Sequence, residues 1–491
     1  MRINIILIGG MLALASCTKW LDVSPKSEVS MDLLFTSREG YQDAVNGLYS
    51  RSVKEDLYGR ELTAGTLDVL AQNYNIDVVD RVGFRQTMLF NYRDNNFINR
   101  QKDSWAGLYT VVANSNLILE HVDGSGNLLE ASERDLIKGE ALAMRAWCHF
   151  DVLRQFAAAP MVTPGAQGIP YVTTFSRKTT PVYTLRQVLD SVIRDLTAAR
   201  ELLKNVDPIV KPGYKVGYTT PDSSTEVSGP MFFQHRRHRL NYFAVTGALA
   251  RVQLYAGNTA AALTMAKEVI ESNKFPWTRQ TDFLNPDEQQ KDRILYKELL
   301  FGLYAPNMTN PLYDRLRNGE TTLNTPPGEL RTMYEVAGPG AEDFRYKQWF
   351  SQQNSSTGGY MRLEKYSRNG DKNLHDLMIP MLRLSEMYYI AAEAVYDTDP
   401  AKGWEYLNTV RKQRGMGVPL NDPSKTVFMN ELVKDARKEF FGEGQIFYMY
   451  KRLNRAYPGL GGNTIQPTPR YSSSPGRTTS SLMVTVKPAN S

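Results

Sequence analysis

Two glutamates with helical spacing are the first candidates for acid–base chemistry in this 491-residue chain. Glu386 and Glu393 lie seven residues apart, which on a helix would separate their backbones by about 10.5 Å. A glycosidase needs two carboxyl groups roughly 5 to 9.5 Å apart across a sugar. Their neighbours are mostly apolar, and buried carboxylates are usually paired with arginine. We therefore expect ion pairs between helices rather than catalysis, and the same for Glu140 with Arg145. The candidate partners of the two glutamates are Arg145, Arg251, Arg411 and Arg437.

Two further patterns resemble metal sites in spacing only. His235 and His238 would face one side of a helix, but the two arginines between them repel a cation, so capping or pairing is favoured. Asn73, Asn75 and Asp77 have the alternate oxygen spacing of a calcium loop, but the glycine and the downstream glutamate of such a loop are missing. The sequence therefore predicts no metal site and no cofactor, and it leaves open whether a calcium ion is bound.

Aromatic residues outside the helical patterns are candidates for ligand binding. A sugar ring stacks its C–H face on a flat side chain, while Asn, Asp, Gln and Arg bond its hydroxyls, and a peptide could use the same groups. The candidate ligand-binding residues are Tyr74, Asn75, Phe84, Trp277, Tyr304, Trp349 and Tyr360. For each ring the alternative is packing within a loop, since large aromatic side chains are mostly buried. Trp105, Trp147 and Trp404 fall in helical stripes and are predicted core residues.

The composition is that of a soluble, folded protein. Hydrophobic residues make up 42% and charged residues 22% of the chain, which excludes a largely disordered protein. A mean hydropathy of -0.41 excludes a polytopic membrane protein. Two cysteines exclude a disulfide framework and a cysteine-built zinc site. The net charge of +6, without a long basic run, gives no reason to expect nucleic-acid binding.

The amino terminus has the pattern of a lipoprotein signal peptide. Residues 1–17 read MRINIILIGGMLALASC, a short basic start and an apolar run that ends in small residues. The pattern predicts removal of residues 1–16 and lipid modification of Cys17, including palmitate. The alternative is an ordinary signal peptide that contains a cysteine. The rest of the chain should be soluble and tethered to a membrane by lipid, with Cys148 buried and inert.

Helical periodicity dominates the remaining chain. Helices are expected over 39–54, 104–121, 130–156, a segment opening at Thr184, 240–256, 259–272, 380–396, 401–414 and 430–452. The pairs 240–256 with 259–272 and 380–396 with 401–414 are αα-hairpins of the tetratricopeptide kind. The sequence therefore predicts a mainly α protein.

The domain organisation follows from where the helical pattern stops. We expect a single unit over 17–491 after the signal peptide at 1–16. Its helical scaffold would cover about 30–272 and 379–455. A long irregular, loop-rich lobe would be inserted at about 273–378, and a Pro/Ser-rich tail would occupy 457–491.

Seven segments of the chain carry motifs whose order along the sequence is informative. They are CTKWLDVSPK at 17–26, LFTSREGYQDAVNGLY at 34–49, GEALAMRAWCHFDVLRQFAAAP at 139–160, ALARVQLYAGN at 248–258, IPMLRLSEMYYIAAEAVY at 379–396, LNTVRKQRG at 407–415 and ARKEFFGEGQIFYMYKR at 436–452. In this order they resemble the SusD/RagB family of Bacteroidetes-type lipoproteins. The chain departs from the family in lacking the carboxy-terminal PIP-x-x-E motif near 484–488, and in the residues at 437–439 and 444–445.

The resemblance implies both a fold and a function. The fold would be a SusD-like scaffold of four tetratricopeptide-like helix pairs. The protein would be a lipoprotein of the outer membrane facing the cell exterior. It would bind oligosaccharides, or peptides as some members do, and deliver them to a SusC-like TonB-dependent transporter for nutrient uptake. It would be a binding protein and not an enzyme. The family's ligand contacts lie in variable loops, so no motif transfers them to this chain.

Two other functions stay open from the sequence. One is a lipid-anchored glycan-degrading enzyme on a helical scaffold, which predicts a pair of carboxylates in the irregular lobe near Trp349. The other is a surface adhesion or scaffold protein, which predicts a protein partner and no small ligand. The sequence also leaves open whether the ligand is a glycan or a peptide.

Overall fold

The computed structural model describes most of the chain between residues 31 and 467. The described residues are 31–76, 80, 82–161, 163, 165–218, 224–306, 312, 315–316, 323–355, 358–367 and 374–467. The predicted signal peptide, Cys17, Asp77 and the tail beyond residue 467 lie outside them.

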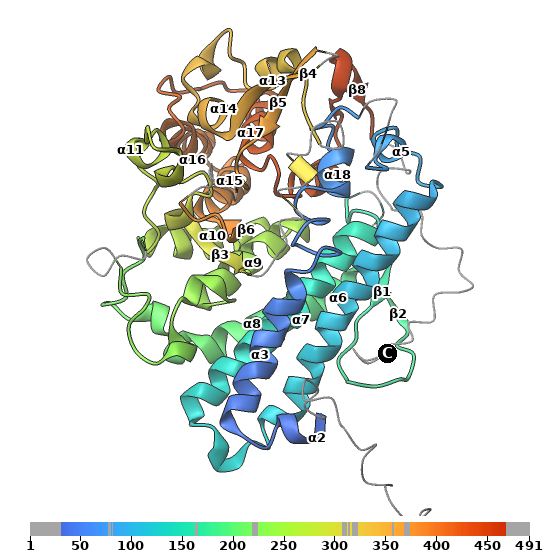
Figure 1. Cartoon of the computed structure of the whole chain (residues 1–491), viewed down its shortest axis with the longest axis vertical. Coiled ribbons are helices and arrows are strands. Elements are labelled where there is room, and N and C mark those ends of the chain that lie inside the picture. Colours follow the sequence, from blue (N-terminus) through green and yellow to red (C-terminus); the bar gives the residue numbers. More distant parts are fainter. Residues whose placement is uncertain are drawn as a thin grey trace, which may run out of the picture.

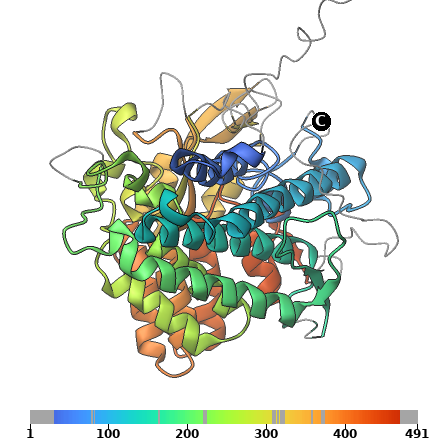
Figure 2. The same ribbon diagram turned by 90° about the horizontal axis from the view of Figure 1, so that it is seen from below.

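A row of helices forms the scaffold, and each helix packs against the next one along the row. The row consists of α3 (Arg38–Ser52), α6 (Asn95–Val122), α7 (Ala131–Phe156), α8 (Leu185–Val206), α9 (Tyr242–Tyr255), α10 (Thr259–Glu271), α15 (Leu384–Val395) and α16 (Pro400–Gln413). Figure 1 shows α3, α6, α7 and α8 side by side, and Figure 2 shows the row continuing in chain order through α9 and α10. The mainly α fold and its helix pairs are as predicted.

Local sequence explains where these helices start and how closely they pack. At the start of α8, Thr184 Oγ1 accepts a bond from Gln187 N at 3.3 Å, while the Gln187 side chain accepts one from Thr184 N at 3.0 Å. This reciprocal capping satisfies donors that a helix start leaves open. In α9, a Cβ at Gly247 would lie 2.8 Å from a Leu382 methyl carbon, so glycine permits the close contact.

Two expected helices differ from the structure. The segment 380–396 begins as strand β6 (Met378–Arg383), which pairs antiparallel with β3 (Leu299–Tyr304), and only then becomes α15. Every residue of β6 is buried, so its unbroken apolar run fits a buried strand as well as a helix.

The segment 430–452 is two helices, α17 (Lys425–Glu439) and α18 (Ile446–Leu453). The chain turns between them at Gly442 and Gly444, whose φ angles are +74° and +65°. A Cβ at Gly444 would lie 2.1 Å from Leu62 O, so only glycine fits there. The buried Asp68 carboxylate accepts both glycine N–H groups, at 2.7 and 3.0 Å. Burial raises the pKa of Asp68 to about 7, although these two bonds lower it.

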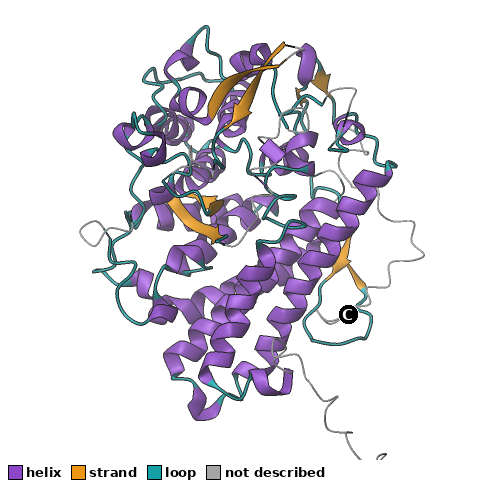
Figure 3. Ribbon diagram, in the orientation of Figure 1, coloured by secondary structure: helices purple, strands orange, loops and turns teal. Residues whose placement is uncertain are grey.

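Short helices and hairpins lie over one end of the helix row. The hairpin of β4 (Phe350–Ser355) and β5 (Gly358–Leu363) stands near α13 (Pro327–Met333), α14 (Phe344–Trp349) and the short hairpin of β7 (Tyr457–Pro458) and β8 (Thr464–Ile465). Figure 3 shows how small the strand content is. The remaining elements are α2 (Met31–Leu34), α4 (Thr66–Leu70), α5 (Arg85–Met88), α11 (Gln280–Phe283), β1 (Gln167–Pro170) and β2 (Val182–Thr184).

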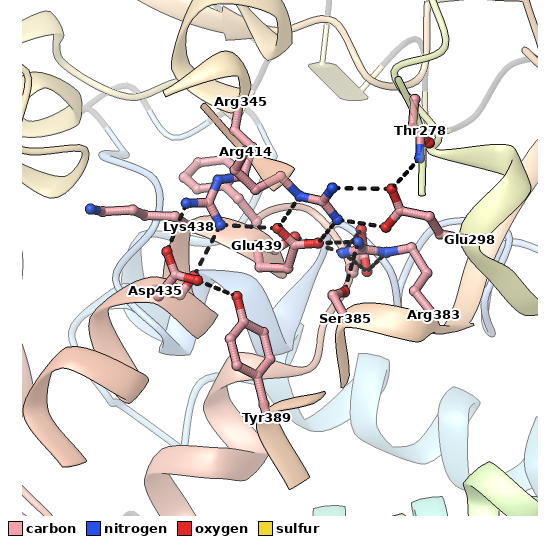
Figure 4. A network of polar contacts seen from close by, with 12 residues as sticks. Thr278, Glu298, Arg345, Arg383, Ser385, Tyr389, Arg414, Asp435, Lys438 and Glu439 are labelled. Atoms are coloured by element: carbon pink, nitrogen blue, oxygen red, sulfur yellow. Dashed lines mark hydrogen bonds and ion pairs between the residues drawn. The ribbon is translucent and has the colours of Figure 1, made fainter. Parts of the chain in front are cut away.

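A buried network of charged side chains joins this end to the helix row (Figure 4). Arg414, which caps α16, bonds both oxygens of Glu298 at 3.0 and 2.6 Å and both oxygens of Glu439 at 2.7 and 3.0 Å. Arg345, from α14, bonds Glu439 at 2.9 Å and Asp435 at 2.8 Å. Each of these charges has an opposite partner, which is the condition for burying charge.

The core contains the three tryptophans and the cysteine that the sequence predicts to be buried. Trp105, Trp147 and Trp404 are buried. Cys148 is a buried free thiol, and burial raises its pKa well above the ordinary value, so the thiol stays protonated. Among the residues that the structure describes, no helix is both long and apolar enough to cross a membrane.

Candidate functional site

The two glutamates with helical spacing are held by arginines. Glu386 bonds Arg251 at 2.6 and 2.7 Å, and both oxygens of Glu393 bond Arg452 at 2.6 Å. The expected ion pairs are confirmed, although Arg452 was not among the candidate partners. Both carboxylates are engaged with guanidinium groups and neither is free to act as an acid or a nucleophile.

Glu140 has a different partner from the expected one. It accepts a bond from Arg236 at 2.7 Å, whereas Arg145 bonds Asp195 at 2.8 Å. The expected ion pair of Glu140 is therefore confirmed, but its expected partner was wrong. Glu140 and Arg145 are five residues apart, and positions at that spacing do not share a helix face.

The histidine pair forms an aromatic stack. The rings of His235 and His238 lie 4.8 Å apart and nearly parallel, and Tyr304 stacks on His238 at 5.5 Å. Burial, with His235 and Arg237 nearby, holds the pKa of His238 well below its ordinary value, so the ring is neutral. Within the described ranges, no three His, Cys, Asp or Glu side chains are grouped to hold a metal ion.

Three of the predicted ligand-binding rings are buried. Tyr74 packs edge-on against Phe441, Phe84 lies under the guanidinium of Arg100 at 3.9 Å, and Trp349 lies under Lys365 Nζ at 3.6 Å. The placement of these rings at a ligand surface therefore needs correction, since an enclosed ring offers no face to a sugar.

Two further candidate ligand-binding residues, Trp277 and Tyr304, are not fully buried and lie in different parts of the structure. Trp277 is half-buried and packs against Tyr388 of α15 at 5.2 Å, which makes it part of the scaffold contact. Tyr304 is 48% exposed, and it lies at the end of β3 with its ring on the histidine stack.

The last two candidates, Asn75 and Tyr360, come together in one small sheet-like structure. Asn75 N donates to Asn324 O at 2.9 Å, and Thr325 exchanges backbone bonds with Met361 at 3.2 and 2.8 Å. Met361 lies in β5, which pairs with β4. Asn75, residues 324–325, β5 and β4 thus form a continuous ladder of four segments, which we call the Asn75 ladder.

One face of the Asn75 ladder is packed inward over most of its length, although Gln352 and Asn354 on the same face of β4 are exposed. Successive residues of an extended chain point to opposite faces. Tyr74, Thr325, Met361 and Leu363 are accordingly buried. Thr325 Oγ1 also donates to Asn73 O at 2.7 Å, which fixes the first two segments together.

The opposite face of the ladder is polar and accessible. Residues paired across strands share a face, so Gln353 lies beside Tyr360 and Ser351 lies beside Arg362. With Asn75 and Asn324 these side chains form the outer face of the ladder, and all of them are half-buried. The outer face consists of Asn75, Asn324, Ser351, Gln353, Tyr360 and Arg362. It combines one aromatic ring with amide and guanidinium groups.

The polar groups of this face are held in place by the buried carboxylate of Glu364, which directly follows β5. Arg362 Nε donates to Glu364 Oε1 at 2.8 Å, Ser351 donates to the same carboxylate, and Gln353 Nε2 donates to Ser351 Oγ at 2.9 Å. Sequence reasoning missed Asn324, Gln353 and Arg362. No local signal marks them, because their position beside Tyr360 depends on the register of the ladder.

Family comparisons match both ends of the chain. Residues 19–216 match a family model described as "Starch-binding associating with outer membrane", and residues 331–483 match one described as "SusD family". SusD-like protein P38 of Formosa agariphila is 23% identical over 516 aligned positions, covering 91% of this chain and 90% of that protein. SusD-like protein P25 of the same organism is 23% identical over 57% of this chain. This chain spans about half, 48%, of the length of P25.

Solved structures have the same fold. A SusD superfamily protein of Bacteroides thetaiotaomicron matches with a TM-score of 0.70 and 22% identity, covering 89% of this chain and 96% of that one. A SusD-like carbohydrate binding protein of Bacteroides vulgatus matches with a TM-score of 0.69 and 18% identity, covering 89% and 94%.

Proposed function

Because this chain belongs to the SusD/RagB family, we propose that it binds carbohydrate at the outer membrane and does so on the outer face of the Asn75 ladder. The observation that carries this proposal is the half-buried Tyr360 between amide and guanidinium side chains. The ring can stack on the C–H face of a sugar, and the neighbouring groups can bond its hydroxyls. The exposed Tyr304 is a second candidate contact.

The proposal also includes the location of the protein in the cell and the transporter that receives its ligand. A lipid on Cys17 would anchor it, facing the cell exterior, and the bound oligosaccharide would pass to a SusC-like TonB-dependent transporter. The motifs at 17–26 and the family membership support this arrangement. A peptide could occupy the same face, because Asn75, Gln353 and Arg362 can also bond a peptide backbone.

Binding without cleavage fits the charges around the ladder. Glu364, the carboxylate that directly follows β5, is buried and accepts bonds from Arg362, Ser351 and Ser367. A general acid or nucleophile must instead reach the scissile bond. This engagement favours binding over the glycan-degrading alternative.

Calorimetric titration of the chain from Thr18, which retains every described residue, tests the proposal. The panel contains oligosaccharides of different linkage and mixed peptides, with product analysis of each mixture. We expect saturable heat with an oligosaccharide and no products. Tyr360→Ala should weaken binding about tenfold, equivalent to about 1.4 kcal/mol, because the ring face is lost.

Tyr183→Ala is the matched control, since this tyrosine is also partly exposed but lies in β2, away from the ladder. It should bind as the wild type does. Equal loss in both variants, or unchanged binding in Tyr360→Ala, would place the site elsewhere. Released products would favour the enzyme, and saturable heat with peptides alone would make the ligand a peptide.

A further inference from the structure

One edge of the Asn75 ladder is without a partner strand. Among the residues that the structure describes, β4 pairs only with β5, so it ends the ladder on that side. Thr325 and Met361 exchange two backbone bonds, and Gln352 lies opposite Met361 in the β4–β5 pair. Because Met361 directs both of its backbone groups toward Thr325, its pair with Gln352 is the kind that shares no hydrogen bond. The N–H and C=O groups of Gln352 therefore point away from β5.

A second residue of β4 is oriented in the same way. Every second residue of a strand directs its backbone groups to the same side, so Asn354, opposite Gly359, also presents its N–H and C=O outward. Gln352 and Asn354 are exposed, whereas Phe350, the third residue of this phase, is buried. Within the described ranges, no other backbone group bonds those of Gln352 or Asn354. We call the outward backbone groups of Gln352 and Asn354 the free edge.

Strand β4 lacks the features that commonly protect the edge of a sheet, which are proline, lysine and bulges. Each of the other three described strand pairs contains a proline, namely Pro170 in β1, Pro380 in β6 and Pro458 in β7. The pairs β1–β2 and β3–β6 also have register shifts. In contrast, β4 and β5 contain neither proline nor lysine and stay in one register from Phe350 to Ser355. The free edge is therefore open to a further strand.

The size of the free edge favours a peptide over a second folded protein. Strand β4 has six residues, which span about 20 Å in an extended chain. A stable interface between two proteins buries about 1,200 to 2,000 Å² in total, much more than one edge of this length offers. An extended peptide fits this edge, because its backbone groups point to one side at every second residue, as those of Gln352 and Asn354 do.

We propose that the free edge of β4 binds an extended peptide, which joins the Asn75 ladder as a further strand. The N–H groups of Gln352 and Asn354 donate to carbonyl oxygens of the peptide, and their carbonyl oxygens accept from its N–H groups. Contacts of this kind use the main chain of the ligand, so they suit peptides of mixed sequence. The site goes beyond the proposed carbohydrate surface, because it uses the edge of the ladder and not the side chains of its outer face.

Calorimetric titration of the chain from Thr18 with a pentapeptide tests this site. The probe is Thr-Val-Thr-Val-Thr with an acetylated and an amidated end. Its match carries N-methyl groups on the three central residues, so any two alternate residues include at least one without an N–H. We expect saturable binding of the first peptide with a dissociation constant below about 1 mM, and at least about tenfold weaker binding of the second.

Gln352→Pro tests the same contact from the side of the protein. Proline at this position removes only an outward N–H, so the bonds between β4 and β5 remain and the melting temperature should stay close to that of the wild type. Binding of the pentapeptide should weaken at least about tenfold. Gln352→Thr, which keeps the N–H, is the matched control and should bind the peptide as the wild type does.

Several outcomes would overturn the proposal. These are no binding of the pentapeptide at millimolar concentration, equal binding of its N-methylated match, or unchanged binding in Gln352→Pro. Equal loss in Gln352→Pro and Gln352→Thr would assign the contact to the side chain and exclude strand addition. A wild-type dimer that Gln352→Pro abolishes would make the occupant a second copy of the chain.

Two features of the design keep the result interpretable. If Gln352→Pro did not fold, the comparison of the two peptides would still decide between the outcomes. The oligosaccharide titration depends on the Tyr360 ring, whereas the pentapeptide titration depends on the main chain of Gln352. The proposed function and this proposal can therefore fail separately.

Discussion

At the scale of single residues, adjacent side chains have opposite roles in the candidate site. Tyr74 is buried under the Asn75 ladder, while its neighbour Asn75 is on the outer face. Met361 is buried, while Tyr360 beside it is accessible. The alternation of an extended chain causes this difference, so residue type alone does not identify a ligand contact.

Lys451 gives a prediction at the same scale. It is buried, and its Nζ donates to Arg154 O at 2.6 Å. Burial, and then the charge of Arg154, lower the pKa of Lys451 from 10.5 to about 7. Above pH 7 the unfolded chain therefore binds more protons than the folded one. The free energy of unfolding should rise with pH between about 7 and 10, by up to about 1.4 kcal/mol per pH unit.

Denaturant unfolding of the wild type and of Lys451→Met at pH 6, 7, 8 and 9 measures this contribution. The stability difference should shift in favour of the wild type as the pH rises. Comparing the two proteins removes the effect of other groups that titrate in this range. Parallel stability curves for the two proteins would show that Lys451 keeps its ordinary pKa.

At the scale of elements, the buried charge network determines how α14, α16 and α17 meet. Glu439 of α17 accepts bonds from Arg345, Arg383 and Arg414. Burial by itself would raise the pKa of Glu439, but these arginines hold it well below its ordinary value. The stability it contributes is therefore present above the unfolded pKa of about 4.3 and is lost as the pH falls.

Glu439→Gln tests the network at neutral pH. The amide leaves three buried guanidinium groups short of a negative charge, and we expect a loss of about 3 to 5 kcal/mol in the free energy of unfolding. Lys425→Ala, which breaks the exposed pair with Asp397, is the control and should change stability by less than about 1 kcal/mol. Similar small losses in both variants would mean that the network adds little stability.

At the scale of the whole molecule, segments distant in sequence build the candidate site. Asn75 lies between α3 and α6, and β4 and β5 follow α10, yet these segments join in one ladder. The helix row is the common support for both. The Asn75 ladder lies at the end of the molecule where the β4–β5 hairpin stands (Figure 1).

The proposed lipid anchor gives a prediction at this scale. In a Bacteroidetes host, the wild-type chain should be found in the membrane fraction and be labelled by a palmitate analogue. Cys17→Ser should remove the label and leave most of the protein in the soluble fraction, because one residue carries the anchor. Cys148→Ser is the control and should keep both properties. Membrane retention of unlabelled Cys17→Ser would point to a different attachment.

The sequence alone determined the family, the mainly α class and the extents of most scaffold helices, because periodicity and caps act within a few residues. It could not separate β6 from α15, since a buried apolar run fits both. It also could not exclude Tyr74, Phe84 and Trp349 from the surface, or find Asn324, Gln353 and Arg362. Those positions follow from the strand register and from contacts between segments hundreds of residues apart, which only the tertiary structure decides.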